Sequence, residues 1–179
     1  MMPLKEKIEK AKPALRAAIG EKNDLALPQL VKVVVSSGTG KAKDKKRNEL
    51  VADRLSKITG QKAALRGAKQ SIATFKSRQG DIIGVAVTLR GPRMYQFLDK
   101  LINIAMPRMR DFKGYTPSSI DDMGNLTIGI REHIVFPETI DEEIKDVFGM
   151  SVTIVTTAQN KKDALEFFKQ MGFPFRKSM

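Results

Sequence analysis

The amino-acid sequence predicts an α+β fold, with an antiparallel or mixed sheet, helices packed on one face and the other face open. Two observations support this fold class. Runs with strand-like alternation are interleaved with runs of helical periodicity, and both kinds are apolar on one side only. The strand-like run from Ile82 to Arg90 also follows a basic stretch, Arg66 to Gly80, that is rich in small residues. We therefore expect one long basic loop held out by the sheet.

The length and charge of the chain favour a single domain with a polyanionic partner. Its 179 residues suffice for one well-buried core, and no Pro/Gly/Ser-rich linker divides them. We expect one domain over 1–179, made of an N-terminal helical segment at 1–27 and an α+β body at 28–179. The net charge is +12, and residues 57–113 hold twelve basic against three acidic residues. Such an excess points to nucleic acid or an anionic surface.

Cysteine usage and hydropathy indicate the compartment. The chain has no cysteine, which excludes disulfides and thiolate metal sites and is typical of a reducing cytoplasm. The N-terminus alternates charged and apolar residues and lacks the apolar core of a signal peptide. No apolar run is long enough to cross a bilayer. We expect a cytoplasmic protein with no membrane contact.

The first half of the chain begins with a helix from Leu4 to Ile19, which Pro13 should kink or break. A strand from Leu30 to Val35 follows, and then a basic helix from Ala42 to Ile58. A short strand near Ala63 to Arg66 leads into the basic loop. The inward line of the basic helix is expected to consist of Val51, Leu55 and Ile58.

The strand after the loop has one branched apolar face and one nearly bare face. The apolar face consists of Ile83, Val85, Val87 and Leu89. The bare face consists of Ile82, Gly84, Ala86, Thr88 and Arg90. Small residues that end in arginine let a nucleic-acid backbone approach closely. A covering helix would favour the same small residues, and the sequence leaves both interpretations open.

The second half of the chain opens with a helix at Gly91-Pro92 that ends before Pro107. Six of its residues should face inward, namely Met94, Phe97, Leu98, Leu101, Ile102 and Ala105. Residues 108–125 are irregular, and such a long excursion suggests function or a partner. The later elements are strands at Leu126 to Ile130 and Ile134 to Phe136, an acidic helix around Asp141 to Phe148, a strand at Ser151 to Thr157 and a helix at Lys161 to Met171.

The basic loop carries four cations and no acidic residue before Asp81; the cations are Arg66, Lys69, Lys76 and Arg78. Because such a segment buries little, we expect its order to come from a polyanion laid against it. A solvated surface loop is the alternative. Phe75, the one aromatic residue of the loop, either stacks on a nucleotide or packs back onto the domain.

Catalytic motifs fail when they are tested residue by residue. The turn around Gly40 resembles a phosphate loop, but Val35 stands where its first glycine belongs and Ala42 replaces the hydroxyl residue. His133 is the only histidine, which excludes a histidine metal cluster, and it is expected at the surface or at a strand end. Asp121 and its neighbour are interpreted as turn formers. We expect no enzyme, cofactor or metal, so an RNA-modifying or nucleotide-using enzyme is disfavoured.

A series of ordered blocks identifies a family. They are Gly60-Gln61-Lys62, Ala68-Lys69, Phe75-Lys76, Arg78-Gln79-Gly80, Val87-Thr88-Leu89-Arg90-Gly91, Pro107-Arg108, Arg110-Asp111-Phe112, Gly124-Asn125, Arg131-Glu132, Phe136-Pro137-Glu138 and Phe173-Pro174-Phe175-Arg176-Lys177. The chain resembles, from Pro28 onward, the fifth protein of the large ribosomal subunit, the 5S-rRNA-binding ribosomal protein family in its bacterial form.

The resemblance implies a structural, non-catalytic component of the large ribosomal subunit. Members of this family bind 5S rRNA with the open sheet face and help attach it to the large subunit in the central protuberance. They contact large-subunit rRNA and other 5S-rRNA-associated proteins, peptidyl-site tRNA through the basic loop, and a small-subunit head protein at an intersubunit bridge. A free-standing regulatory RNA-binding protein is the alternative.

Carried over to this sequence, the resemblance assigns three groups of residues. The 5S rRNA group is Lys32, Ser36, Gln61, Lys62, Thr88 and Arg90. The tRNA-contacting group is Lys69, Ser71, Thr74, Phe75, Lys76, Arg78 and Gln79. The bridge group is Arg108, Arg110, Asp111 and Lys113. The chain departs from the usual family pattern at Ser36, which is commonly Asn, at Gln70, which is usually basic, and at Ile120, Asp122, Met123 and Leu126.

Overall fold

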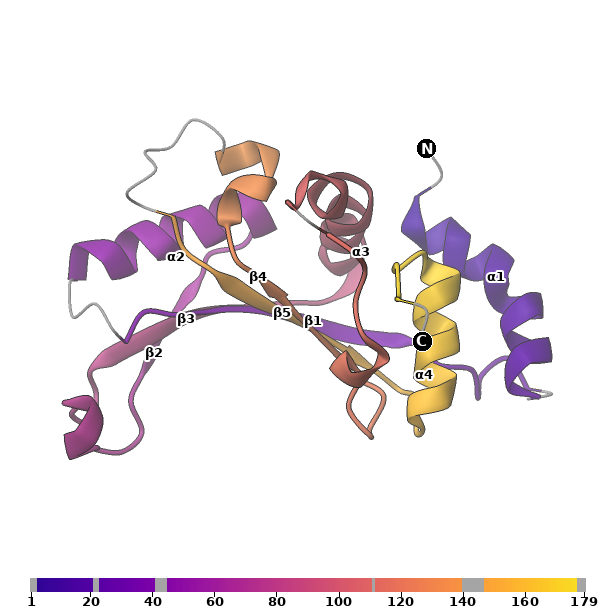
Figure 1. The fold of residues 1–179 in the computed structure, drawn as a ribbon, viewed down its shortest axis with the longest axis horizontal. Helices are drawn as coiled ribbons and strands as arrows, with labels where there is room; N and C mark the ends of the chain where they lie inside the picture. Colours follow the sequence, from indigo (N-terminus) through magenta and orange to yellow (C-terminus); the bar gives the residue numbers. More distant parts are fainter. Residues whose placement is uncertain (1–2, 21–22, 41–44, 111, 140–146, 177–179) are drawn as a thin grey trace. The chain divides into compact units, whose positions relative to one another are not determined.

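The computed structural model describes residues 3–20, 23–40, 45–110, 112–139 and 147–176. Within these ranges the chain forms four α-helices and a five-stranded sheet of order β2-β3-β1-β5-β4, which confirms the α+β fold class (Figure 1). The helices are α1 (Leu4–Ile19), α2 (Lys45–Thr59), α3 (Gly91–Lys100) and α4 (Lys161–Met171). The strands are β1 (Leu30–Gly38), β2 (Ala64–Gly67), β3 (Ile82–Leu89), β4 (Leu126–Ile130) and β5 (Met150–Thr156).

Contacts along the chain define two compact units. The first unit comprises Met1–Val33, Arg90–Ile128 and Thr153–Met179, and the second comprises Val34–Leu89 and Gly129–Val152. Helices α1, α3 and α4 belong to the first unit, whereas α2, β2 and β3 belong to the second. The whole basic loop therefore lies in the second unit.

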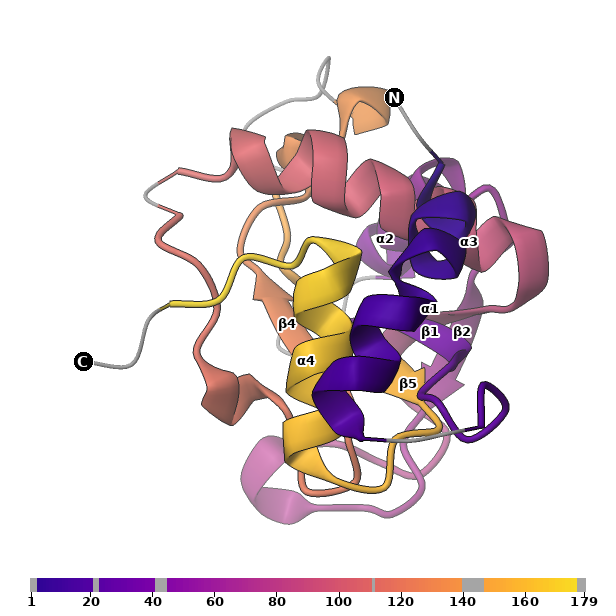
Figure 2. The same cartoon turned by 90° about the vertical axis from the view of Figure 1, so that its right-hand side faces the viewer.

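In the first unit, α1 packs against α4 and α3, and α1 lies beside α4 in Figure 2. Leu4 and Leu15 of α1 are each only 3% exposed. On α4, Phe167 and Phe168 are buried, and the ring of Phe168 meets that of Phe173 edge to face at 5.6 Å. Because aromatic side chains bury large apolar areas, these rings form the centre of the unit.

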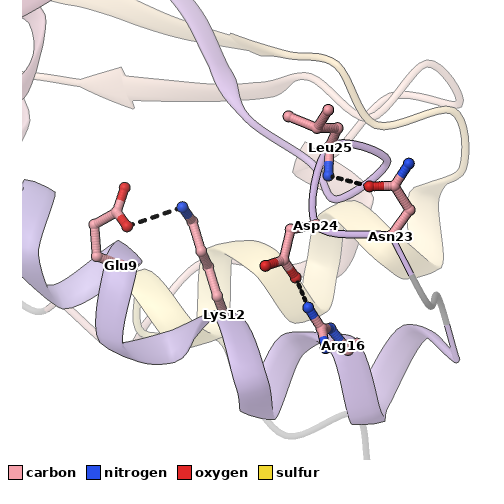
Figure 3. A network of polar contacts seen from close by, with 6 residues as sticks. All are labelled: Glu9, Lys12, Arg16, Asn23, Asp24 and Leu25. Carbon is pink, nitrogen blue, oxygen red and sulfur yellow. Dashed lines mark hydrogen bonds and ion pairs between the residues drawn. The ribbon is translucent and has the colours of Figure 1, made fainter.

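Helix α1 runs without interruption through Pro13, so of the expected kink or break the break does not occur. Proline removes one helical hydrogen bond, and burial of the apolar side of the helix against α4 offsets this loss. The exposed side carries an ion pair between Lys12 Nζ and Glu9 Oε2 at 2.9 Å (Figure 3). A second ion pair, Arg16 with Asp24, ties the end of α1 to the segment that follows it (Figure 3).

Helix α3 and its continuation bury the six residues expected to face inward, Met94, Phe97, Leu98, Leu101, Ile102 and Ala105. The helix begins at Gly91, so Pro92 is its second residue. Its α-helical part ends at Lys100, and the chain continues through a π-helical turn (Leu101–Ala105) and a 3₁₀ turn (Met106–Arg108). The helical path therefore extends past Pro107, where it was expected to have ended.

In the second unit, α2 packs against β3. The inward line predicted for α2, Val51, Leu55 and Ile58, is buried to 1% exposure or less. The helix is described from Lys45 onward, so its predicted start at Ala42 lies outside the described residues.

Strand β3 turns its predicted apolar face toward the core at Val85, Val87 and Leu89, which are all buried. Ile83 continues this face but is 39% exposed at the loop end of the strand. Strand β2 pairs antiparallel with β3, with Leu65 opposite Val85. The two strands therefore lead directly into and out of the basic loop.

The strand predicted at Ile134 to Phe136 is wrong, because His133–Val135 forms a 3₁₀ turn. The backbone N–H of Phe136 donates to the His133 carbonyl at 3.1 Å, and the hydroxyl of Thr139 donates to the same carbonyl at 3.0 Å. Pro137 lacks an N–H and cannot continue a strand ladder. An apolar triplet was therefore mistaken for a strand.

His133 is fully buried, which corrects the expectation that it lies at the surface or at a strand end. Its ring stacks on Phe148 with centroids 4.2 Å apart and planes 10° apart. Its Nδ1 accepts the backbone N–H of Phe148 at 3.3 Å, and its own backbone N–H donates to the Phe148 carbonyl at 3.1 Å. A buried histidine with these partners fixes a core position. The acidic helix expected around 141–148 lies largely outside the described residues.

Candidate nucleic-acid interface

The bare face predicted for β3 is partly exposed to solvent. Ile82, Gly84, Ala86 and Thr88 are all of intermediate burial, while the alternate residues from Val85 onward are buried. Strand β1 shows the same alternation, with Val34 and Ser36 half-buried. Among the described residues, no helix fully covers this face of the second unit. Of the two interpretations left open by the sequence, the structure supports an accessible face.

Close packing of β1 against β3 favours glycine at position 84. A Cβ at this position would lie 3.1 Å from the carbonyl oxygen of Ser37 on β1. That separation is tighter than ordinary van der Waals contact, so the backbones of β1 and β3 approach each other more easily with glycine here. The small residue at this position of the β3 face is thus explained in part by the packing of the two strands.

The structure brings together Gln61 and Thr88, two of the residues assigned to 5S rRNA. The side-chain amide of Gln61 donates to the backbone carbonyl of Thr88 at 3.1 Å. Gly60, with φ +68°, ends α2 in the left-handed conformation and turns the chain toward this position. The Ser56 hydroxyl accepts the backbone N–H of Ala63 at 3.0 Å and so fixes the connection from α2 to β2.

The other members of the 5S rRNA group are divided between the two units. The Ser36 hydroxyl lies 3.3 Å from the hydroxyl of Ser151, so the two can exchange a hydrogen bond between neighbouring strands. Lys62 is exposed beside Gln61. Lys32 is half-buried in β1 and Arg90 is exposed directly after β3, and both belong to the first unit.

The basic loop has a hydrogen-bonded framework of its own. Ala68 donates to the Asp81 carbonyl at 2.8 Å and accepts from Gly80 at 3.0 Å, which continues the pairing of β2 with β3. Farther out, the backbones of Ile72 and Ser77 exchange two hydrogen bonds of 3.0 and 3.2 Å. The expectation that order in the loop comes from a polyanion is therefore incomplete.

Two side chains extend this framework by accepting backbone hydrogen bonds. The Ser71 hydroxyl accepts the backbone N–H of Gln79 at 2.9 Å. The Asp81 carboxylate accepts the backbone N–H of Arg78 at 2.9 Å. All seven residues assigned to tRNA contact are exposed: Lys69, Ser71, Thr74, Phe75, Lys76, Arg78 and Gln79.

Phe75 closes a short 3₁₀ turn (Ala73–Phe75) and is 73% exposed. It therefore does not pack back onto the domain, which was one of the two possibilities left by the sequence. Lys76 follows in the left-handed conformation, with φ 50°, and reverses the chain toward Ser77. Such a conformation is uncommon for lysine and is tolerated in tight turns. The turn presents an aromatic ring amid exposed cations.

The excursion after α3 exposes Arg108, Arg110 and Lys113, while Asp111 lies outside the described residues. Tyr115 pairs with the C-terminal segment, because its N–H donates to the Pro174 carbonyl at 2.9 Å and its carbonyl accepts from Arg176 at 2.9 Å. Sequence reasoning missed this pairing. The alternation of Phe173, Pro174 and Phe175 was the available signal.

Gly114 permits this pairing. Its φ is +88°, and a Cβ would lie 3.1 Å from the Pro174 carbonyl oxygen. Next to it, burial raises the pKa of the Tyr115 phenol above its usual value. The excursion is therefore held at Tyr115 by the C-terminal segment.

The described ranges contain no group of three or more His, Asp or Glu residues that could hold a metal ion. None of the helices in the same part of the chain has the length and hydropathy that crossing a bilayer requires.

Asp121 is a turn former, as expected, since its carboxylate accepts the backbone N–H of Asn125 at 2.6 Å and the side-chain amide of Asn125 at 2.8 Å.

Comparison with known proteins points to one family. The family model described as ribosomal protein L5 matches residues 23–78, and the model described as the C-terminus of the same ribosomal family matches residues 82–175. A protein of Thermoanaerobacter sp. (strain X514), named large ribosomal subunit protein uL5, is 48% identical over 179 residues, which cover 99% of this chain and 100% of that protein. Proteins of the same name from Moorella thermoacetica and Anaeromyxobacter sp. (strain Fw109-5) are 47% and 45% identical, covering 98% and 97% of this chain and 99% and 97% of their own.

Proposed function

This chain belongs to the ribosomal protein L5 family, and on that premise we propose that it is a structural protein of the large ribosomal subunit that binds 5S rRNA. The relatives compared above are named as ribosomal proteins, and no catalytic role is indicated for them. The protein would act at the ribosome in the cytoplasm, in the central protuberance. There it would help attach 5S rRNA to large-subunit rRNA, beside other 5S-rRNA-associated proteins.

The observation that carries this proposal is the accessible face of β3, near whose end Gln61 is hydrogen-bonded to Thr88. Small side chains along β3 let a phosphate backbone approach the sheet, and Thr88 offers a hydroxyl there. The hydrogen bond from Gln61 to the Thr88 carbonyl holds both residues in one place. RNA in double-helical form is recognised largely by shape and by 2′-hydroxyl and phosphate contacts, which such a surface can supply.

The basic loop and the excursion after α3 supply the remaining contacts in this proposal. The exposed cations and Phe75 of the loop would meet peptidyl-site tRNA, since phosphates need cations and unpaired bases stack on aromatic rings. The excursion, with Arg108, Arg110 and Lys113, would meet a small-subunit head protein at the intersubunit bridge.

Binding to 5S rRNA is tested with the double variant Thr88→Val, Arg90→Ala. Loss of two good polar contacts should weaken binding by about 1–3 kcal/mol, which is roughly fivefold to 150-fold in Kd. The measurement is titration of 5S rRNA and of an unrelated RNA of equal length across a salt series. Lys162→Ala, at an exposed lysine of α4, is the matched control for lost charge. An unchanged salt titration for the double variant would show that the wrong face was chosen.

The loop contact is tested separately with Lys69, Lys76 and Arg78 all changed to Ala. Because these side chains are exposed, the fold and 5S rRNA binding should persist while tRNA binding weakens. Circular dichroism and the same 5S rRNA titration serve as internal controls. Loss of folding in this variant would contradict the assignment of the loop as a contact surface.

A further inference from the structure

A hollow of about 830 Å³ lies in the second unit between the basic loop, the start of β3 and α2. Phe75 and Ile83 line it with apolar surface and are 73% and 39% exposed. Ser71 and Ser77 add hydroxyl groups. A hollow of this size that combines apolar walls with polar groups is typical of sites for small ligands or for single groups of larger ones.

Asn48 of α2 also lines the hollow, and its side chain has an unpaired hydrogen-bond acceptor that a ligand could satisfy. The residue is only 4% exposed, and its Oδ1 has no hydrogen-bond partner among the described residues. Buried polar atoms are nearly always paired, so an unpaired acceptor beside a hollow calls for a partner. The terminal torsion of asparagine is broad and two-fold, so a rotation of the carboxamide can present either Oδ1 or Nδ2 to the hollow.

The charges around the hollow favour RNA over a peptide as the partner. Lys69 stands exposed on the same loop, and Lys76 and Arg78 line the hollow itself. Asp81 also lines the hollow, and its carboxylate accepts the backbone N–H of Arg78 at 2.9 Å. With two cations and one carboxylate in its lining, the hollow favours a polyanion such as RNA, and its apolar walls favour a base over a phosphate as the group that enters.

We propose that this hollow holds one unpaired adenine of a bound RNA strand, stacked on Phe75 with its amino edge at Asn48. An asparagine carboxamide pairs with adenine through N6 and N7, which uses one acceptor and one donor. Aromatic side chains are the usual platforms for splayed bases in RNA recognition. This inference rests on the proposed contact between the basic loop and RNA, and adds to it a base preference.

The experiment uses hexaribonucleotides of uridine in which one central base is adenine, or purine without the amino group. Binding to the full-length protein is measured by fluorescence anisotropy. Methyl NMR of Ile83 reports on the hollow, and Ile104 of the first unit is the internal control. The adenine strand should bind at least about fivefold more tightly than the purine strand, and should shift the Ile83 methyl signal but not that of Ile104.

Two variants separate base recognition from stacking. Asn48→Leu removes an unpaired buried acceptor, so it should fold. It should abolish the preference for adenine over purine, and it should weaken the adenine strand more than the purine strand, because purine retains only the N7 contact. Asn48→Ala serves the same purpose if leucine does not fit. Phe75→Ala should weaken both strands by similar factors. Equal binding of the two strands to the wild-type protein, or an Ile83 signal that moves with an apolar peptide and not with RNA, would overturn the inference.

The triple loop variant separates this inference from the proposed function. If it loses affinity for all hexamers while the wild-type protein ignores the amino group, the loop binds RNA and the adenine site is wrong. If it binds all hexamers as the wild-type protein does, the loop contact itself is wrong, and the adenine inference falls with it.

Discussion

Gly124→Ala should be among the most damaging single-methyl additions in the first unit. Gly124 lies in the tight turn between Ile120 and Leu126, with φ +76°. A Cβ there would lie 2.7 Å from the Cβ of Ala158 and 3.2 Å from that of Ala164, and both alanines are buried. The turn cannot move away freely, because the hydroxyl of Thr156 donates to the Gly124 carbonyl at 2.8 Å.

Two effects add in this variant. A left-handed backbone conformation costs an L-residue about 1–2 kcal/mol relative to glycine. Forcing an extra methyl group into a packed site costs about 1–3 kcal/mol more. The free energy of unfolding should therefore fall by roughly 2–5 kcal/mol, which lowers Tm by about 4–20 °C in a chain of this size.

Two other glycines separate these effects. Gly20 has φ +81° and no atom within 4 Å of the position that a Cβ would take, so Gly20→Ala should show only the conformational cost. Gly38 has neither feature, so Gly38→Ala should be close to neutral. The measurement is urea denaturation of the three variants followed by circular dichroism. If Gly124→Ala destabilises the protein no more than Gly20→Ala, the crowding argument is refuted.

Two further predictions concern the half-buried ring of Tyr115 and the fully buried ring of His133. In a Tyr95→Phe background, the remaining Tyr115 phenol should ionise only above its ordinary pKa of about 10, as seen by absorbance, because burial raises its pKa. Below about pH 10 the phenol is protonated in both the folded and the unfolded chain, so it adds no pH dependence to the free energy of unfolding. Above about pH 10 the unfolded chain releases a proton that the folded chain retains, so the free energy of unfolding falls as pH rises. Tyr115→Phe should remove this pH dependence. His133→Leu should lower the free energy of unfolding by about 1–3 kcal/mol, since it leaves the Phe148 N–H without its acceptor. Denaturant titration checks this value, and an unchanged midpoint would contradict the role given to the ring.

The elements predicted best are those with local signals at both ends. The expected bounds of α1 and α4 agree with the structure, because Gly20 and Gly172 end these helices in the left-handed conformation. Strand β3 was predicted from alternation alone, and its buried and half-buried faces follow that alternation. In each case the information lies within a few residues of the element.

The failures share a different origin. His133 was placed at the surface because its neighbours in sequence are charged, whereas its burial depends on Phe148, which is fifteen positions away and stacks on it. The framework of the basic loop was missed for a related reason. Its backbone hydrogen bonds join Ala68 to Gly80 and Asp81, and no periodic pattern in the sequence predicts such pairing. Contacts between distant residues are what a single sequence conveys least.

The departures from the family pattern in the turn at 120–126 fall where its geometry tolerates them. Asp122 and Met123 are exposed, and Met123 is 69% so. Ile120 and Leu126 form an apolar, buried pair across the turn, at 1% and 0% exposure.

The same turn is fixed by residues that are not among these departures. Asp121 accepts two hydrogen bonds from Asn125, and Gly124 occupies the space that a Cβ would overfill. Because the backbone is set by these three residues, the substitutions change the surface of the turn and not its course. A partner that contacts this side would therefore meet a different side chain at Met123 on an unchanged framework.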